Sequence, residues 1–465
     1  MPLVMVCALM SALVLPVFTR SAATLLAGQW PEAGQALAVA SNSVLGVIAV
    51  GLVWHFNLGR SISRRRIFVL GAVLAAIAGF SPPLLEDDFY RYLWDAYQWH
   101  TQASPYTYSP SDFFGDEQLA PRWQEILTGI NNPHLKTLYG PVLQYLFYLA
   151  YWLAPGELWA WQLVLWLIYL GGLLLILKTC ADKNGPLCYA LHPLILQEAI
   201  ASAHPDLLVG LLLLVALLCW QKRMPVVLGA VLGVAIATKV SALVVAPLFC
   251  CVPPSQWACR VNAEQSSRHS ILSWLCLTSM AVMLMLVLFY GPVVWHTARS
   301  GASASELDSL LVFGHQWRFN PLSYRVLELF LPAALARLLC ALVLLFGCLG
   351  LITLMLALAH RYRRLPVVFL LLLLLFLSPV VNPWYWLWLL PLACYLARPW
   401  VVLVAVFAPV SYINSTVLAQ INSQYLASTE LPFLVPWWVT LLQLMAFAWL
   451  LLSEWRWFAS GSSDN

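Results

Sequence analysis

The sequence predicts an all-α polytopic membrane protein, and three observations support this: composition, mean hydropathy and the distribution of charge. Of 465 residues, 62% are apolar and only 9% are charged. The mean hydropathy is +0.80. A water-soluble domain of this composition would expose apolar surface to water. The 24 Lys and Arg residues stand in short groups between apolar runs, as expected for a chain that crosses a bilayer repeatedly.

Five basic groups predict which ends of the apolar runs face the cytoplasm, because Lys and Arg beside a spanning segment stay on that side during insertion. If all five are cytoplasmic, the chain crosses an even number of times between them. The polar stretches 84–138 and 291–325 then lie outside, and both termini lie inside. The groups are Arg60 with Arg64 to Arg66, Lys178 with Lys183, Lys222 with Arg223, Arg260 with Arg268, and Arg361 with Arg363 and Arg364.

The apolar runs between these groups predict about fourteen crossings. In chain order they are 3–19, 33–56, 67–83, 157–178, 186–200, 206–220, 225–238, 240–252, 271–290, 327–358, 366–377, 384–397, 399–412 and 434–456. Residues 139–154 are predicted as an interfacial helix on the outer side, since a crossing there would break the parity of the charges. We expect the whole chain, 1–465, to form one transmembrane domain whose outer loop, 84–156, carries short interfacial helices.

Several of these runs are shorter than the ~20 residues that a lone spanning helix needs. Short or broken helices are tolerated at membrane depth where they pack against protein or line a water-filled cavity. Alternatively, longer helices could be kinked at Pro193, Pro205 and Pro383. Both interpretations put the same polar residues near the outer face.

The outer loop begins with three acids, Glu86, Asp87 and Asp88, directly after an apolar run. If the following residues are helical, Asp88, Arg91 and Asp95 share one face. Ionisable groups at membrane depth are costly unless they are paired or functional, so these residues could supply a base and an anion clamp. The alternative is a solvated helix start with acids at its positive end.

Four further polar clusters are predicted on the same side of the bilayer, and this convergence favours a single outer-facing site. Lys239 stands alone among apolar residues, so it either extends to the surface or meets an anion brought by a ligand. The aromatic residues after the acids suit an interfacial belt or stacking against sugar rings. The clusters are His192 to Asp206 with Glu198 and His204, Lys239, His315 to Pro321, and Ser378 to Tyr385; the aromatic residues are Tyr97, Trp99, Tyr106, Tyr108 and Tyr139.

Other classes of partner are not indicated. A net charge of +4 is small for this length, which argues against nucleic acid. The 11 cysteines form no CxxC pair, so neither a zinc site nor a disulfide framework is predicted. Glu86, Asp87, Asp88 and His204 are acceptable ligands for a divalent metal, but their spacing does not demand one. The sequence therefore predicts no required cofactor.

The string Asp-Asp-Phe-Tyr-Arg-Tyr-Leu-Trp-Asp at 87–95, with Ser104-Pro105-Tyr106, resembles the first-loop motif of bacterial GT-C mannosyltransferases that use a polyprenyl-phosphate sugar donor. Further motifs of that family follow in the same order up to about residue 395. They are Tyr139-Gly140-Pro141, His192-Pro193-Leu194, His204-x-Asp206, Lys239, Trp317-x-Phe319-Asn320 and Pro383-Trp384-Tyr385. The chain differs from the usual family pattern at Ala96, Ser104, Pro205 and Asn382.

This resemblance implies a GT-C-like bundle in the bacterial inner membrane whose active site faces the periplasm. It implies transfer of a sugar, mannose, from polyprenyl phosphate to a glycolipid or glycan acceptor, with inversion. Asp88 would be the base, with Asp87 as second choice, and Arg91 and Lys239 would bind the donor phosphate. The implied pocket residues are Tyr92, Asp95, Tyr106, Tyr139, His204, Asp206, Trp317, Asn320, Asn382, Trp384 and Tyr385.

Two other functions would use similar features: a transporter or flippase of a lipid-linked glycan, and a polymerase or ligase of lipid-linked saccharides. Transporters often contain internal repeats of topology, and the sequence shows none. A flippase also has little use for a base-like aspartate beside an arginine. Both kinds of transferase require a proton acceptor.

Overall fold

The computed structural model describes residues 31–81, 83, 86–254, 264–300, 306–358, 364–413 and 435–460, and these residues form helices and loops without a strand. An isolated β-bridge pairs Phe319 with Val380. The first predicted crossing, 3–19, lies outside the described residues, as do Arg260, Arg361 and Arg363.

In the first half of the chain, the helices follow the predicted runs closely, because Pro, Gly or charged residues bound those runs. They are α2 (Pro31–His55), η1 (Leu58–Ser61), α3 (Arg64–Ala78), α7 (Leu158–Thr179), α8 (Asn184–Leu191), η3 (Ile195–Ala201), α9 (Asp206–Gln221), α10 (Pro225–Thr238), η4 (Val240–Val244) and α11 (Ala246–Cys251). The predicted outer loop contains α4 (Asp88–Gln102), η2 (Pro110–Phe113), α5 (Pro121–Thr128) and α6 (Pro141–Leu153).

In the second half, helix α13 (Glu264–Ser300) extends beyond the end predicted from the sequence. The predicted loop starts at residue 291, at Gly291-Pro292, yet α13 continues through Pro292. The apolar residues Val293, Val294 and Trp295 extend the helical pattern beyond the proline. The other elements are α14 (Glu306–Gln316), α15 (Ser323–Leu327), α16 (Ala333–Ala357), α17 (Val367–Leu377), η5 (Pro383–Trp388), α18 (Leu390–Tyr395), α19 (Pro399–Ala405), η6 (Ala408–Tyr412) and α21 (Trp437–Ser460).

Four described helices are long and apolar enough to cross a membrane, namely α7, the 271–299 part of α13, α16 and α21. The bent pair formed by η3 and α9 makes a fifth candidate. The chain is thus a helical membrane protein. This set does not support the predicted count of about fourteen crossings, because several apolar runs form short helices such as α10 and α17.

The bend between η3 and α9 is sharp, with an angle of 116°. Ala203 adopts a left-handed conformation there, with a φ of 63°. Here the chain forms a broken helix instead of one long helix kinked at Pro205. The break brings His204 and Asp206 into the interior, where their exposed fractions are 0% and 1%.

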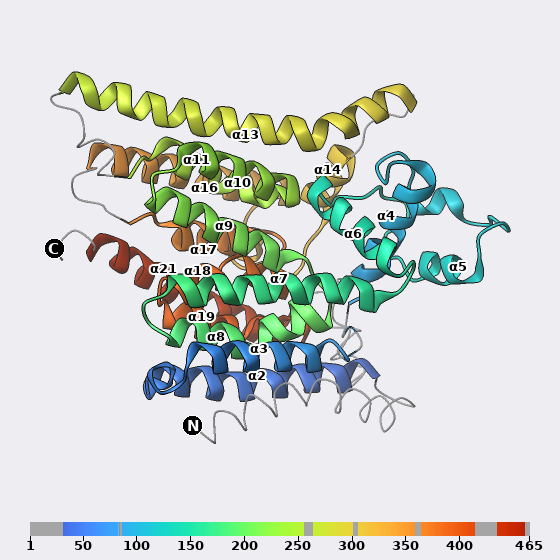
Figure 1. The fold of residues 1–465 in the computed structure, drawn as a ribbon, viewed down its shortest axis with the longest axis horizontal. Helices are drawn as coiled ribbons and strands as arrows, with labels where there is room; N and C mark the ends of the chain where they lie inside the picture. The colour runs from blue at the N-terminus through green and yellow to red at the C-terminus, as the bar shows by residue number, and fades with distance from the viewer. Residues whose placement is uncertain are drawn as a thin grey trace.

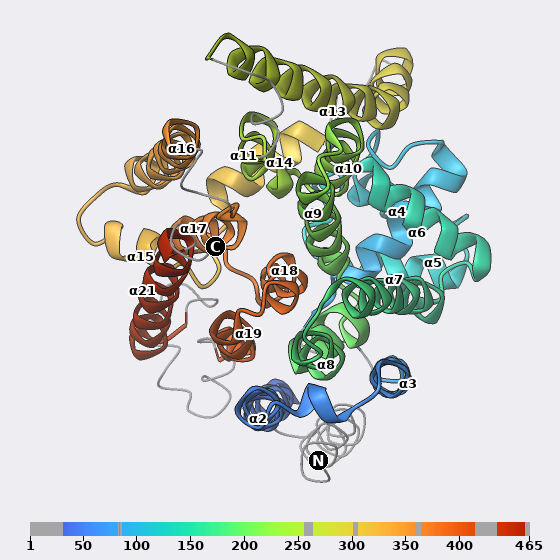
Figure 2. The ribbon, with the colours of Figure 1, turned by 60° about the vertical axis from the view of Figure 1, so that its left-hand side comes forward.

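The longer helices lie roughly side by side, and α4, α5 and α6 form a group at one end of the bundle (Figure 1). The turned view in Figure 2 shows α9 and α18 in the interior, with α2, α13, α16 and α21 around them. Apolar residues on α13 remain exposed, for example Met280 at 70%, as expected for a helix that faces lipid. The candidate site lies where the α4–α6 group meets the bundle.

Candidate active site

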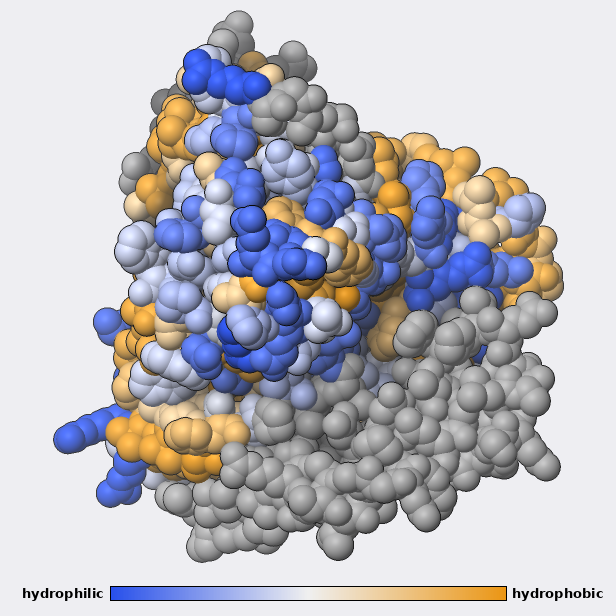
Figure 3. All heavy atoms as spheres, turned by 90° about the vertical axis from the view of Figure 1, so that its right-hand side faces the viewer, coloured by the Kyte–Doolittle hydropathy of each residue, from blue (hydrophilic) through white to orange (hydrophobic). Residues whose placement is uncertain are grey.

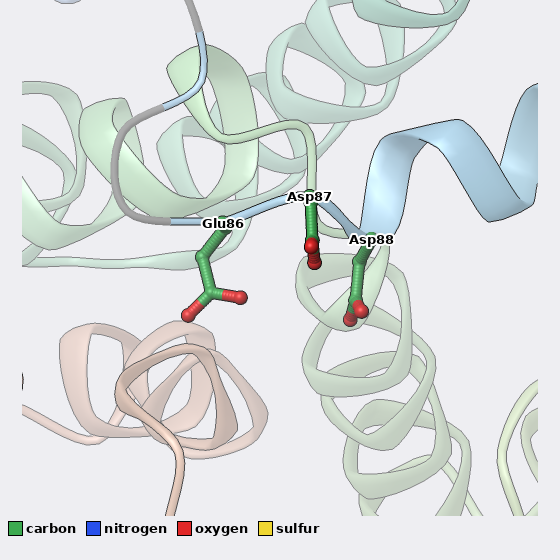
Figure 4. Close-up of side chains that lie close together, drawn as sticks. All are labelled: Glu86, Asp87 and Asp88. Atoms are coloured by element: carbon green, nitrogen blue, oxygen red, sulfur yellow. The ribbon is translucent and has the colours of Figure 1, made fainter. Parts of the chain in front are cut away.

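Three consecutive acidic residues, Glu86, Asp87 and Asp88, form one edge of the site. Asp88 is the first residue of α4 and Asp87 occupies its N-cap position, where the positive end of the helix favours negative charge. The carboxylate oxygens of Glu86, Asp87 and Asp88 approach within 4.8 Å of one another. Figure 4 shows the three side chains on the same side of the backbone.

Asp88 is the best held of the three acids. Its Oδ1 accepts a hydrogen bond from Asn131 Nδ2 at 3.1 Å, and its Oδ2 accepts one from the Tyr139 hydroxyl at 3.2 Å. Asp88 is partly exposed and Asp87 is exposed. The side chain of Asp88 therefore has a fixed orientation but can still meet a substrate.

The other two acids hold their protons more tightly than usual. Desolvation raises the pKa of Asp87, although a hydrogen bond from Asn131 opposes this effect. Burial, together with the neighbouring Asp88 carboxylate, raises the pKa of Glu86 well above its usual range. Burial and the neighbouring carboxylates thus both favour the protonated forms of Glu86 and Asp87.

A chain of hydrogen-bonding groups leads from Asp88 into the bundle. The Tyr139 hydroxyl lies 3.5 Å from the Tyr92 hydroxyl, which in turn lies 3.3 Å from His204 Nδ1. On its other side, His204 Nε2 is 3.7 Å from Glu198 Oε2. This chain joins α4, the start of α6 and the break before α9.

Lys239 has a protein partner, Asp206, which stands 33 residues before it in the sequence. Its Nζ lies 2.7 Å from Asp206 Oδ1, and Trp388 Nε1 donates to the same oxygen at 2.6 Å. Lys239 Nζ also lies 4.7 Å from the centroid of the Tyr385 ring. The lysine side chain is 17% exposed, whereas that of Asp206 is 1% exposed. Asp206 therefore fixes the lysine, while part of the lysine side chain remains accessible to a ligand.

Local backbone features bring these groups together. Helix α10 ends at Thr238, and Lys239 is extended, with φ −154° and ψ 128°, so its side chain leaves the helix. A Cβ atom on Gly140 would lie only 2.2 Å from the Ala237 carbonyl oxygen. Only glycine allows this approach, which holds Tyr139 against the end of α10. Pro141 then starts α6, where the missing N–H costs nothing.

The segment 382–388 forms an aromatic wall beside this centre. His204 and Trp384 stack with ring centroids 3.9 Å apart, and the Tyr385 and Trp388 rings stack at 4.5 Å. Asn382 precedes these residues at the N-cap of η5 and is 9% exposed.

Phe319 and Asn320 pair with the segment that directly precedes that wall. Phe319 N donates to Pro379 O at 3.2 Å, and Val381 N donates to Phe319 O at 2.8 Å. Asn320 Nδ2 lies 3.5 Å from Val381 O, and Trp317 packs against Phe313 at a centroid distance of 4.9 Å. Phe319 and Asn320 thus hold the segment before η5, whereas the predicted pocket residue Trp317 packs against Phe313.

Arg91 differs most from its predicted role as a phosphate ligand. It is 8% exposed, and its guanidinium donates to three backbone carbonyls: Leu135 O at 3.0 Å, Asn132 O at 3.0 Å and Asn131 O at 3.4 Å. The sequence could not reveal these carbonyls, which lie in a loop about forty residues away. Arg91 therefore fixes the loop that supplies Asn131 to Asp88.

Two further predicted pocket residues, Asp95 and Tyr106, form hydrogen bonds with other groups of the protein. Asp95 is fully buried and accepts hydrogen bonds from Thr137 and Gln144, which ties α4 to α6. The Tyr106 hydroxyl donates to Tyr139 O at 2.9 Å. Both residues shape the segment that carries Tyr139.

Several residues of the site are not in the set predicted from the sequence. Trp388 follows Tyr385 by three residues, a spacing that could have identified it had a 3₁₀ turn been expected. Asn131 stands in a polar Asn-Asn-Pro stretch. Tyr412 hydrogen-bonds Glu198 Oε2 at 3.2 Å and also interacts with Glu86. No local pattern marks this tyrosine.

Glu86, Asp87 and Asp88 could together hold a divalent cation, since oxygen ligands suit Mg²⁺ or Mn²⁺. His204, the fourth ligand considered, faces Tyr92 and Glu198 instead. Any cation would therefore rest on the three carboxylates.

Residues 2–254 match the family described as alpha-(1->6)-mannopyranosyltransferase, N-terminal domain. The chain belongs to this family. It is thus a membrane glycosyltransferase of the mannosyltransferase class, which confirms the resemblance found in its motifs. The matched part carries Asp88, Asp206 and Lys239, whereas the aromatic wall of η5 lies beyond it. No curated protein and no solved structure matches the chain.

Proposed function

We propose that this protein transfers mannose from a polyprenyl-phosphate donor to a lipid-linked or cell-envelope glycan at the outer face of the bacterial inner membrane. The family name suggests that the bond formed is an α-(1→6) linkage. The observation that carries the proposal is a held carboxylate, Asp88, whose hydrogen-bonded neighbours lead toward the Lys239–Asp206 pair. Tyr139, Tyr92 and His204 link Asp88 to the break before Asp206.

In this proposal Asp88 is the general base. It takes the proton of the acceptor hydroxyl as that oxygen attacks the anomeric carbon from the face opposite the phosphate. The new carbon–oxygen bond forms, the bond to the phosphate oxygen breaks with its electron pair, and the configuration inverts. Asn131 and Tyr139 each donate to Asp88, which supports a fixed orientation for this step.

Lys239 is proposed to stabilise the departing phosphate. A fixed cation gains most where negative charge develops, in the transition state. Asp206 and Trp388 position the lysine, and its 17% exposure leaves it open to a ligand. Arg91 is a positioning residue here, because its guanidinium is occupied by backbone carbonyls.

Hydrophilic residues gather across the middle of the face that carries α4, α5 and α6, with apolar residues beside them (Figure 3). This distribution suits a surface that meets an aqueous compartment at the bilayer edge. We propose that the whole chain acts as one catalytic unit of the GT-C type, and the fourteen-crossing topology remains part of that proposal.

The test is transfer from polyprenyl-phosphate-mannose by purified Asp88→Asn and Asp87→Asn proteins, with donor binding measured in parallel. Asn keeps the shape of Asp88 but accepts no proton, so turnover should fall about 10²- to 10⁴-fold while donor binding persists. Asp87→Asn should retain most of its activity. If Asp87→Asn is inactive and Asp88→Asn is not, the two roles are exchanged, and two active variants would refute the mechanism.

The same assay separates the alternatives. A flippase would move lipid-linked sugar across vesicles without forming a new glycosidic bond. A polymerase or ligase would use a pyrophosphate-linked oligosaccharide and ignore the monophosphate donor. Family membership favours the mannosyltransferase over both.

A further inference from the structure

A groove lies between α3 and α7 at the end of the bundle away from the candidate active site. Its volume is about 460 Å³, and it is lined by Arg64, Arg65, Phe68, Leu174, Leu177 and Lys178. Arg64 and Arg65 begin α3, and Lys178 stands in the last turn of α7. In Figure 1 the turn between α2 and α3 lies opposite the α4–α6 group.

The cations of the groove are not paired with acids in the described part of the chain. None of Arg64, Arg65 and Lys178 forms an ion pair within the described parts of the chain. Arg64 donates to the Cys180 carbonyl at 3.2 Å, which ties α3 to the end of α7. Arg65 and Lys178 are exposed. Three positive charges thus line one opening without an ion-pair partner among the described residues.

Apart from the three cations, the walls of the groove are apolar. Leu174 precedes Lys178 by four residues, so the two lie on one face of α7. Leu174 is 40% exposed, and Leu167, about two turns farther along the same helix, is 56% exposed. Phe68 forms the opposite wall on α3. The charged opening therefore continues into a strip of surface suited to an acyl chain.

We propose that this groove binds an anionic phospholipid, with its phosphate between Arg65 and Lys178 and an acyl chain along Phe68 and Leu174. Basic pockets at helix ends attract anionic headgroups. A soluble phosphate would gain nothing from the apolar walls, and a zwitterionic headgroup would leave positive charge uncompensated. Because α3 leads toward Glu86 and Asp88, the lipid should also stabilise the helix that precedes the site.

The test uses the full chain in neutral detergent and measures binding of phosphatidylglycerol and of phosphatidylcholine with the same acyl chains, by native mass spectrometry. Phosphatidylglycerol should bind preferentially and raise thermal stability. The double variant Arg65→Gln, Lys178→Gln should weaken that binding about 30-fold, from about 1 kcal/mol for each cation. Leu174→Asp, on the exposed wall, should weaken it as well.

The matched control is Arg66→Gln with Lys222→Gln. It removes the same charge from exposed cations outside the groove, so phosphatidylglycerol binding should remain within about threefold of the original. Equal binding of both lipids, equal loss in the control, or binding of glycerol 3-phosphate as tight as that of the lipid would each overturn the proposal.

Discussion

At the scale of single residues, Asp95 illustrates how a carboxyl group can be structural although it stands in the same helix as the proposed base, Asp88. Thr137 and Gln144 both donate to its Oδ2, and its Oδ1 has no hydrogen-bond partner among the described residues. Burial raises the pKa of Asp95 to about 6, although Arg91 opposes the shift. Asp95 lies in α4, which is not among the candidate membrane spans.

The raised pKa predicts a pH dependence of stability. The folded pKa of Asp95 exceeds the unfolded value, so its ionisation penalises the fold. The penalty is absent below about pH 4 and complete above pH 6, and it amounts to at most about 3 kcal/mol. Thermal unfolding at pH 5 and pH 7.5 should show a loss of stability that is smaller in Asp95→Asn. An identical loss in both proteins would exclude Asp95 as its source.

Variants of the Lys239–Asp206 pair can separate the role of Lys239 in folding from its role in donor binding. Lys239→Met leaves Asp206 buried without a counter-charge, which should cost about 3 to 5 kcal/mol of stability. The double variant Lys239→Met, Asp206→Asn removes that charge and should recover most of the loss. If Lys239 meets the donor phosphate, donor affinity should remain about 10- to 150-fold low in the double variant. Recovery of affinity together with stability would show that the lysine is only structural.

At the scale of elements, many helix bounds follow from the sequence. Helix α10 starts and ends at the residues predicted, and α9 and α17 differ by one residue at one end. Apolar runs bounded by Pro or charge define such helices locally. The break at Ser202 to Asp206 was also predictable, because polar residues and a proline interrupt an apolar run there.

The pairing between elements could not be predicted in the same way. Lys239 and Asp206 are 33 residues apart, and Trp388 reaches Asp206 from 182 residues away. No local sequence pattern predicts which carboxylate will pair with a lysine in the folded protein. The set of polar segments was thus accessible from the sequence, whereas the partners of Arg91, Asp95 and Lys239 were not.

The contact between Gly140 and the end of α10 gives a prediction for these two elements. In Gly140→Ala, the new Cβ would lie 2.2 Å from the Ala237 carbonyl oxygen and 3.0 Å from that of Thr238. Backbone must move, so Tyr139 and Lys239 should separate, and both donor binding and turnover should fall at least tenfold. The control is Gly350→Ala in α16, where the Cβ meets nothing within 4 Å and activity should be unchanged. Normal turnover by Gly140→Ala would show that the close approach is dispensable.

At the scale of the whole molecule, the basic groups predict its orientation in the membrane. A cysteine at Glu117, in the exposed loop before α5, should react with an impermeant reagent added outside intact cells. A cysteine at Ser61, beside the Arg60 group, should react only after the cells are opened. Both positions are exposed. Labelling is compared with that of the parent protein, whose own cysteines set the background, and the reverse pattern would invert the proposed topology.

The indole of Trp388 has a consequence for recombining this protein with its relatives. It follows the matched segment 2–254 by more than a hundred residues, yet it donates to the carboxylate of Asp206 within that segment. A chimaera joined near residue 254 would therefore combine the lysine–aspartate pair of one parent with the aromatic wall of another. Such hybrids should be active only when the 382–388 segment is exchanged along with the N-terminal part. The two segments that form this contact must therefore come from the same parent.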